Sequence, residues 1–365
     1  MKKILFVAPF PPPVHGAALR NQSVAESKRI NDRFVMKAFH ANQASDVHDI
    51  GRFSLKKVLR TINDFLALVL TLYRFRPDLV YFNISLFGFA LYRDSLYTVL
   101  FKVTGHRLLY HLRTQGVKEQ IDKSRFKKLL FQYLFRDVQV ICLSRALFQD
   151  IADVYGGEPF IVGNGIAVEE VGSSVLSKNS EVPQILFLSN FSIKKGVNEL
   201  FGAFEILKNK GTQFRGVIVG RPFDYTEEDL RNKVEELDMV QYVTVVGPLY
   251  GSKKVNTFIE SDIFAFPTYF EAFPGVVLEA MQFGLPVVST FEGAIPEIIQ
   301  DGETGLLTEK QNVEQLANAL ELLINDQSLR EKLGKSGKNR FFKHFTLEAF
   351  ENSMVDVFNH VLNDQ

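Results

Sequence analysis

The chain has 365 residues, of which 46% are hydrophobic, and its 42 Lys and Arg balance 42 Asp and Glu. Such a length is enough for two globular domains that each bury a core, and a neutral chain gives no reason to expect a nucleic-acid partner. The single cysteine, Cys142, excludes an intramolecular disulfide and fits a reducing cytoplasm.

The charges are divided unevenly along the chain. Residues 1–168 hold 24 basic and 13 acidic residues, and subtraction from 42 of each leaves 18 basic and 29 acidic residues, so the two parts carry +11 and −11. Such asymmetry indicates that the first part meets phosphates or lipid headgroups, with solvated charged faces as the alternative.

Neither a signal peptide nor a membrane span is expected. The first ten residues, MKKILFVAPF, predict a buried strand, because the apolar run is short and meets three prolines. The apolar run 65–73 is much shorter than the roughly twenty residues that cross a bilayer.

The first half alternates apolar runs with amphipathic segments, a pattern typical of a parallel sheet covered by helices. A long amphipathic helix is predicted over residues 54–75. Small residues at Gly16 and Ala17 open a helix after the first strand and would let the backbone approach a ligand. A simple strand-to-helix turn is the alternative, because the GxGxxG fingerprint of dinucleotide binding is absent. Strands are predicted at residues 3–8, 79–83, 107–111 and 138–143.

His111 stands at the carboxyl end of a predicted strand, where the ligand-binding residues of open parallel sheets collect. A structural histidine with polar partners in the core is the alternative. Arg113, two residues later, is a candidate contact for an acceptor or a phosphate.

Residues 123–136, KSRFKKLLFQYLFR, combine cations with aromatic and aliphatic side chains and predict a helix that is basic on one side. Two interpretations stay open for this helix. It docks on an anionic membrane surface, or it is a core helix with a solvated basic face.

Residues 168–183, VEEVGSSVLSKNSEVP, are polar and without periodicity, which predicts a linker between two domains, 1–167 and 184–345. The strand and helix alternation then restarts at residue 184. Lys195 lies in a strand-to-helix loop, where a lysine can neutralise a diphosphate leaving group; an ordinary exposed lysine is the alternative.

The stretch 262–286, DIFAFPTYFEAFPGVVLEAMQFGLP, predicts a strand, a loop and a helix. The first amides of the helix have no intrahelical acceptor, and with the helix dipole they favour a phosphate. Glu271 lies in the loop and Glu279 about one turn into the helix, so both carboxylates can face one pocket and accept hydrogen bonds from adjacent hydroxyls. Two unrelated surface carboxylates are the alternative.

The run EAFPGVVLEA, with Pro267 before it and GLPVVST after it, resembles the Glu-x7-Glu element of retaining glycosyltransferases of family GT4, the glycosyl transferases group 1. The resemblance implies an α/β fold of the GT-B type, with two facing Rossmann-like domains and parallel sheets. It also implies a C-terminal helix, residues 346–365, that crosses back to the first domain. It spans nearly the whole chain and is most specific in residues 184–307.

The resemblance also implies roles for individual residues. Glu279 would contact the nucleotide ribose, Glu271 the donor sugar and Lys195 the diphosphate, and His111 would lie near the donor sugar, so the implied catalytic residues are Lys195, Glu271 and His111. Asn190 stands where the family commonly has an Arg, which leaves more of the diphosphate charge to Lys195 and to helix amides. Further donor-binding positions are Gly16, Ala17, Asn190, Val246, Leu249, Phe273, Gly275, Val276 and Val277.

The implied reaction is retaining transfer of a hexosyl or N-acetylhexosaminyl group from a nucleotide sugar, a UDP-sugar ahead of GDP-mannose, without a metal or other cofactor. The acceptor would be a lipid-linked or cell-surface saccharide in capsule, O-antigen or lipopolysaccharide synthesis, at the inner face of the cytoplasmic membrane. Two alternatives stay open. One is a non-catalytic nucleotide-sugar-binding subunit of a glycan-assembly complex, favoured by Asn190, and the other is a GT-B fold sugar-nucleotide epimerase.

Overall fold

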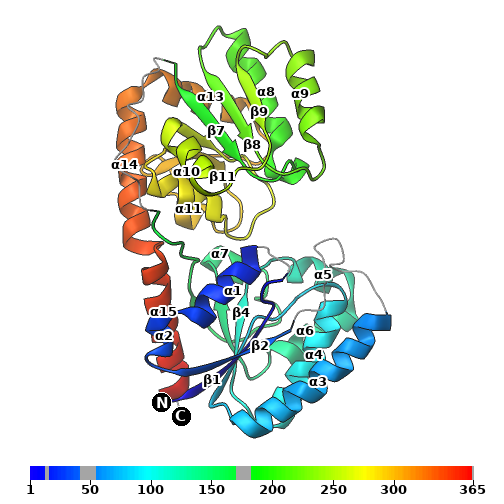
Figure 1. The fold of residues 1–365 in the computed structure, drawn as a ribbon. Coiled ribbons are helices and arrows are strands. Elements are labelled where there is room, and N and C mark those ends of the chain that lie inside the picture. The colour runs from blue at the N-terminus through cyan, green and yellow to red at the C-terminus, as the bar shows by residue number, and fades with distance from the viewer. Residues whose placement is uncertain (13–15, 42–54, 170–181, 364–365) are drawn as a thin grey trace. The chain divides into compact units, whose positions relative to one another are not determined.

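The computed structural model describes residues 1–12, 16–41, 55–169 and 182–363. Their contacts divide the chain into two units, the first formed by Met1–Gly163 with Phe350–Gln365 and the second by Asn164–Ala349 (Figure 1). The chain therefore leaves the first unit after Gly163. Most of the predicted linker, residues 170–181, lies outside the described residues.

A six-stranded sheet forms the core of the first unit, with the strand order β2-β1-β3-β4-β5-β6 and parallel pairing throughout. Nearly every residue of β1, β3 and β4 is buried, because helices cover both faces of the sheet. This burial explains why these strands were recognisable as continuous apolar runs. The strands are β1 (Lys3–Ala8), β2 (Val35–His40), β3 (Leu79–Phe82), β4 (Leu108–Leu112), β5 (Gln139–Cys142) and β6 (Phe160–Ile161).

The helices of the first unit follow the strands in alternation, and α6 is the predicted basic helix. Ser124 sets its start, because the Ser124 hydroxyl accepts a hydrogen bond from the Lys127 amide at 3.3 Å. In the described part of the chain, no helix combines the length and the apolar content that a bilayer span needs. The helices are α1 (Gly16–Glu26), α2 (Lys28–Asn31), α3 (Leu55–Phe75), α4 (Gly88–Val103), α5 (Val117–Lys123), α6 (Arg125–Phe135) and α7 (Arg145–Phe148).

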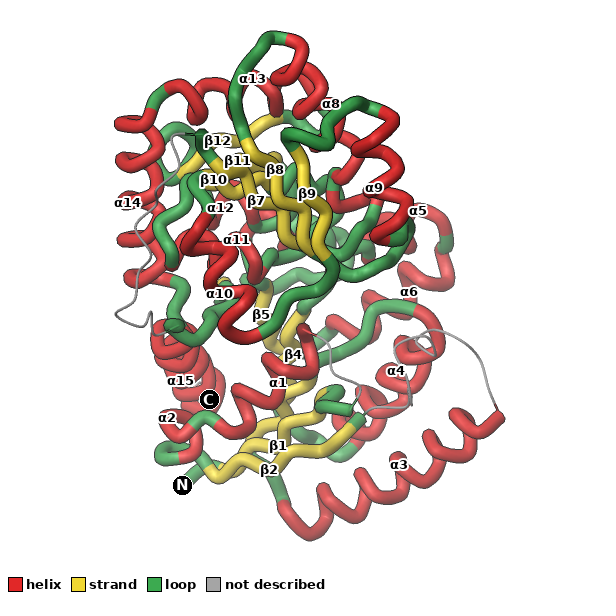
Figure 2. The backbone as a smooth tube through the Cα atoms, turned by 45° about the horizontal axis from the view of Figure 1, so that its top comes forward, coloured by secondary structure: helices red, strands yellow, loops and turns green. Residues whose placement is uncertain are grey.

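The second unit contains another six-stranded parallel sheet, with the order β12-β11-β10-β7-β8-β9 (Figure 2). Since β10 lies between β7 and β11, the loops that follow these three strands leave the same edge of the sheet side by side. That edge is where open α/β sheets bind ligands. The strands are β7 (Gln184–Leu188), β8 (Arg215–Val219), β9 (Val243–Val246), β10 (Ile263–Ala265), β11 (Val287–Thr290) and β12 (Gly305–Thr308).

Helices connect the strands of the second unit in the same alternation. Thr226 precedes α9 and forms a capping box with Asp229. The Thr226 hydroxyl accepts a hydrogen bond from the Asp229 amide, and the Asp229 carboxylate accepts one from the Thr226 amide. The helices are α8 (Val197–Asn209), α9 (Glu227–Glu236), α10 (Gly251–Glu260), α11 (Gly275–Gln282), α12 (Ile295–Ile298), α13 (Val313–Asn325) and α14 (Gln327–His344).

The last helix, α15 (Leu347–Asn363), packs mainly on the first unit. The Phe358 ring lies 5.6 Å from that of Phe34 and 5.2 Å from that of Tyr81, measured between ring centroids. Where the chain passes between units, its two segments are hydrogen-bonded, since the Leu347 amide donates to the Ile166 carbonyl at 2.7 Å. The C-terminal helix thus returns to the first unit through packing that joins residues far apart in sequence.

Candidate functional site

The loop after β7 carries Lys195 to the carboxyl edge of the second sheet. Gly196 has φ +81°, and a Cβ atom at this position would lie 2.1 Å from the Pro267 carbonyl oxygen. Only glycine tolerates both conditions, so the loop can approach the one that follows β10. The Tyr269 amide donates to the Lys194 carbonyl at 3.0 Å and ties the two loops together.

This close approach brings Lys195 against Glu271. Lys195 Nζ lies 2.7 Å from Glu271 Oε2 and also donates to the Phe270 carbonyl at 3.2 Å. Both charged side chains are 22% exposed, so the ion pair is open to solvent on one side. An ammonium carries three N–H donors, and these two contacts leave one direction for a further acceptor such as a phosphate oxygen.

The loop after β11 supports Glu271 from a third strand. Glu292 is buried at 7% exposure, and its Oε1 accepts a hydrogen bond from the Glu271 amide at 3.4 Å while Lys310 Nζ contacts its Oε2 at 2.9 Å. A Cβ atom at Gly293 would lie 2.0 Å from the Glu271 carbonyl oxygen. Glu292 was not predicted from the sequence, although a carboxylate so soon after a buried strand was a usable signal.

Helix α11 begins beside this ion pair without a side-chain cap, since Pro274 precedes it. Its first amides, from Gly275 onward, therefore stay available to an acceptor outside the helix. The Val277 side chain is fully buried and Phe273 is 7% exposed, so at these two positions only the backbone can meet a ligand. Val276, which lies between these two residues in the sequence, is partly exposed.

Glu279, one turn into α11, also has a lysine partner. Its Oε2 lies 2.7 Å from Lys254 Nζ on α10, and the two side chains are 26% and 30% exposed. Lys254 was not predicted from the sequence, because nothing in the α10 sequence distinguishes it from an ordinary surface lysine. Each of the two predicted ligand carboxylates is therefore held by a lysine from a different element.

The remaining predicted donor-binding positions of the second unit lie on the same edge of its sheet. Asn190 follows β7 and is exposed, so it adds no charge beside Lys195. Val246 ends β9, and Leu249 lies in the short segment before α10; both are partly buried.

In the first unit, His111 lies near the carboxyl end of β4 and is fully buried. Its Nδ1 is 2.6 Å from the Tyr81 hydroxyl. Burial, reinforced by the charge of Arg113, holds the pKa of His111 well below its usual range, and burial raises the pKa of Tyr81 to about 12. Both groups are therefore neutral near pH 7. Among the described residues, His111 Nε2 has no hydrogen-bond partner.

The start of α1 lies on the same edge of the first sheet. Gly16 and Ala17 open α1, and residues 13–15 of the predicted ligand loop are outside the described residues. Asn21, one turn further, is fully buried and donates to the Pro9 carbonyl at 2.9 Å. The predicted site residues thus fall on two sheet edges, one in each unit.

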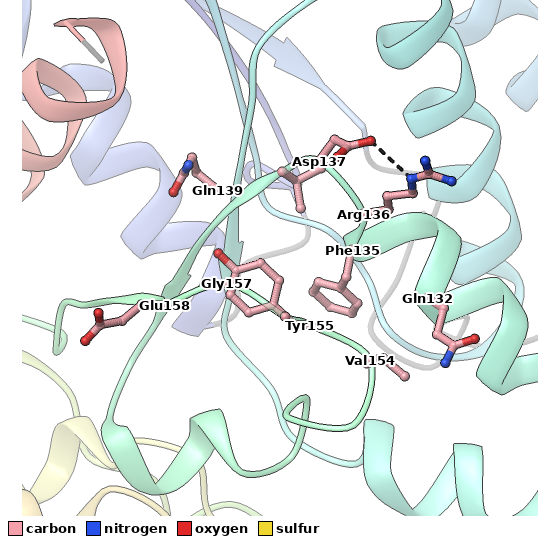
Figure 3. Close-up of a pocket in the computed structure, with 11 residues that line it drawn as sticks. Gln132, Phe135, Arg136, Asp137, Gln139, Val154, Tyr155, Gly157 and Glu158 are labelled. Atoms are coloured by element: carbon pink, nitrogen blue, oxygen red, sulfur yellow. Dashed lines mark ion pairs between the residues drawn. The ribbon is translucent and has the colours of Figure 1, made fainter. Parts of the chain in front are cut away.

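A cavity of about 500 Å³ in the first unit lies at the opposite edge of the sheet. Figure 3 shows the Phe135 and Tyr155 rings in its wall, with Gln139, the first residue of β5, above them. Because parallel sheets bind ligands at the carboxyl ends of their strands, this cavity is separate from the predicted site.

A protein-family model matches the chain over most of the second unit. Residues 170–340 match the family model described as Glycosyl transferases group 1. The second unit of the chain belongs to this family. The capsular polysaccharide biosynthesis glycosyltransferase CapM of Staphylococcus aureus is 30% identical over 174 residues, which are 47% of this chain and 44% of CapM. The chain thus aligns with about half the length of this curated relative.

Solved structures resemble the chain over almost its full length. Sucrose-phosphate synthase from Thermosynechococcus elongatus gives a TM-score of 0.78 at 17% identity and covers 99% of both chains. HepE from Anabaena, solved in complex with UDP and glucose, gives 0.72 at 19% identity and covers 99% of this chain and 100% of its own. At such identities the likeness shows the fold, which is GT-B, as the sequence predicted.

Proposed function

We propose that the protein is a glycosyltransferase that moves a sugar from a nucleotide-sugar donor, a UDP-sugar ahead of GDP-mannose, to a saccharide acceptor. The observation that carries this proposal is the ion pair of Lys195 and Glu271 beside the uncapped start of α11. A cation, a hydrogen-bond acceptor and orphan amides at one strand edge suit a diphosphate joined to a polyhydroxyl group.

Each charged group has a distinct role in the proposed reaction. Lys195 and the first amides of α11 stabilise the negative charge that grows on the diphosphate as the bond to the sugar breaks. Glu271 accepts hydrogen bonds from hydroxyls of the donor sugar, and Glu279 from those of the ribose. His111 acts at the donor sugar as a neutral imidazole, and no metal is required.

The proposed stereochemical course is retention of the anomeric configuration. No nucleophile is assigned to the chain, because Glu271 is already paired with Lys195 and serves to orient the sugar. In this scheme the donor phosphate itself assists the incoming hydroxyl on the face that the leaving group vacates. Analysis of the product anomer tests this part of the proposal, and an inverted product would contradict it.

The proposed acceptor is a lipid-linked or cell-surface saccharide in capsule, O-antigen or lipopolysaccharide synthesis. The name of CapM, which includes capsular polysaccharide biosynthesis, supports this class of pathway. Arg113, which follows β4 in the basic first unit, is the proposed acceptor contact.

Calorimetric titration with UDP, GDP, CMP and ADP tests the donor site directly. We expect one nucleotide to bind selectively and the Glu279→Ala variant to bind it at least about tenfold more weakly, since a charged hydrogen bond to the ribose is lost. Glu260→Ala, which removes an exposed carboxylate from α10, is the matched control and should bind normally. Equal binding by all variants would refute the ribose role of Glu279.

One observation favours a second function, a nucleotide-sugar-binding subunit without catalysis. Asn190 is exposed and neutral where a second cation would strengthen diphosphate stabilisation. Donor binding without turnover across a panel of saccharide acceptors would support this function. Donor turnover in the absence of any acceptor would instead support an epimerase.

A further inference from the structure

Three helices of the first unit, α3, α4 and α6, expose large apolar side chains at a higher density than the rest of the described chain. They hold twelve of the twenty-six large apolar side chains that are exposed among the described residues. We call these twelve the outer face. Its members are Ile62, Leu66, Val69, Leu70 and Tyr73 of α3, Tyr92, Leu96, Val99 and Val103 of α4, and Phe126, Leu129 and Tyr133 of α6.

The outer face follows helical periodicity. On α3 and α4 its members recur at intervals of three and four residues, which places them in one stripe along each helix. Each helix also buries a separate apolar set against the sheet, for example Leu68 of α3, Phe101 of α4 and Phe131 of α6. At 100° per residue the exposed stripes lie on the side opposite these buried residues. An ordinary surface helix needs only the buried stripe.

The three helices that carry these stripes are neighbours in the first unit. The Phe65 ring of α3 lies 6.5 Å from the Tyr97 ring of α4, and Lys102 Nζ of α4 lies 4.7 Å from the Tyr133 ring of α6. Figures 1 and 2 show the three helices side by side along the first sheet. Exposed apolar stripes gathered on neighbouring helices are typical of a site of interaction with a protein or a membrane.

The charges on these three helices indicate whether the outer face binds a protein or a membrane. Arg93 and Asp94 of α4 are buried and paired at 2.6 Å, so they contribute no surface charge. The other charged side chains described on these helices are five cations and one Asp: Arg74, Lys102, Arg125, Lys127, Lys128 and Asp64. In a symmetric dimer each copy would present the same patch to the other, so these cations would repel across the interface. An anionic surface pairs with them instead.

We propose that the outer face docks on an anionic lipid bilayer, with its apolar side chains in the headgroup region and its cations on lipid phosphates. The docking is peripheral, because the apolar residues lie on the surface of packed helices rather than along a spanning segment. It extends the predicted role of α6 to α3 and α4. It does not depend on the transfer reaction, since none of these residues belongs to the donor site.

Vesicle flotation of the full chain tests the proposal, with phosphatidylcholine vesicles that contain or lack phosphatidylglycerol. We expect binding to the anionic vesicles and much weaker binding to the neutral ones, with a loss of affinity as salt is raised. Equal binding to both vesicles would overturn the electrostatic part of the proposal, and no binding to either would overturn all of it.

A triple variant with one change on each helix, Leu66→Ser, Leu96→Ser and Phe126→Ser, isolates the apolar contribution. We expect its partition onto anionic vesicles to fall at least about tenfold, because three apolar side chains no longer enter the headgroup region. The matched control carries Leu322→Ser, Phe342→Ser and Val240→Ser, which are also exposed but lie in the second unit. Undiminished binding by the first variant would overturn the outer face as the docking surface.

Charge reversal separates the electrostatic contribution. Arg125→Glu with Lys128→Glu on α6 should lower partition about tenfold or more, whereas Lys332→Glu with Lys335→Glu, also exposed but on α14, should not. Light scattering on the same samples tests the alternative partner, a second copy of the chain, because it measures whether the protein is a monomer or a dimer. A dimer that the apolar triple variant abolishes, together with no vesicle binding, would show that a second copy of the chain covers the face.

Discussion

Both units contain a six-stranded parallel sheet, but the carboxyl edges of the two sheets differ in chemistry. In the second unit the edge carries ion pairs, Lys195 with Glu271 and Lys254 with Glu279, all partly exposed. In the first unit the corresponding edge carries the buried neutral pair of Tyr81 and His111. The charge of Arg113 acts on this pair, so one edge carries charges of both signs, whereas the other carries a neutral pair beside a single cation.

Helix N-termini show the same contrast. In the first unit the Asp150 carboxylate accepts hydrogen bonds from the amides of Gly116, Val117 and Lys118 at 2.8, 2.9 and 3.1 Å, so a protein anion already occupies the start of α5. In the second unit α8 and α11 begin without a side-chain cap. The start of α5 is thus closed by a carboxylate of the protein, whereas the starts of α8 and α11 are left open to a ligand.

Among the changes considered, removal of the Lys195 charge should have the largest effect, because it removes the cation from the charged edge of the second sheet. We expect Lys195→Met to lower the kcat of sugar transfer by about 10²–10³, because the diphosphate charge loses its cation in the transition state. Steady-state kinetics with the selected donor would measure the effect. Lys194→Met is the matched control. Lys194 Nζ lies 4.6 Å from the centroid of the Phe270 ring, and among the described residues the ion pair of Glu271 is with Lys195 and not with Lys194. Equal losses in both variants would contradict the assignment.

Gly196→Ala should separate the two loops that form the charged edge. We expect a loss of about 3 kcal/mol in the free energy of unfolding, since the new Cβ atom meets the Pro267 carbonyl and the backbone has positive φ. Gly302→Ala is the control, because Gly302 has φ +72° but nothing within 4 Å of a Cβ atom. It should cost only about 1 kcal/mol. Denaturant melts that gave the same cost for both would show that the close approach is unimportant.

Asp150→Ala should open the closed helix start in the first unit. We expect a loss of about 2 kcal/mol in the free energy of unfolding, because three backbone amides of α5 lose a charged acceptor. Asp153→Ala, an exposed neighbour, should change stability by less than about 0.5 kcal/mol. Chemical denaturation measures the free energy of unfolding of both variants. An Asp150→Ala protein as stable as the wild type would refute the capping role.

The smallest effect concerns the buried neutral pair and pH. Because the pKa of His111 is lowered in the folded protein, the unfolded chain binds a proton below about pH 6.5 that the folded chain does not. Stability from this group is therefore complete above that pH and falls on acidification, by at most about 1.4 kcal/mol per pH unit. We expect His111→Gln to flatten this slope in urea melts from pH 7 to pH 5. An unchanged slope would show that His111 does not contribute to it.

The strands were the best predicted part of the fold. β1 spans Lys3–Ala8 as predicted, and β4 is shifted by one residue from the predicted 107–111. Strands buried on both faces need continuous apolar runs, so their sequences report them directly. The break at Ser124 between α5 and α6 was not predicted, because an N-cap serine is conspicuous only once the preceding helix is known.

The sequence by itself determined the alternation of strands and helices, the loop that carries Glu271 and the helix that carries Glu279. These features depend on local patterns of apolar residues and turns, which few residues encode. The tertiary structure alone decided which charges meet. Glu271 pairs with Lys195, 76 residues away, Glu279 pairs with Lys254, and His111 shares a contact with Tyr81. These pairings depend on the strand order and on the close approach of two loops that Gly196 permits. No local stretch of the sequence encodes either of them.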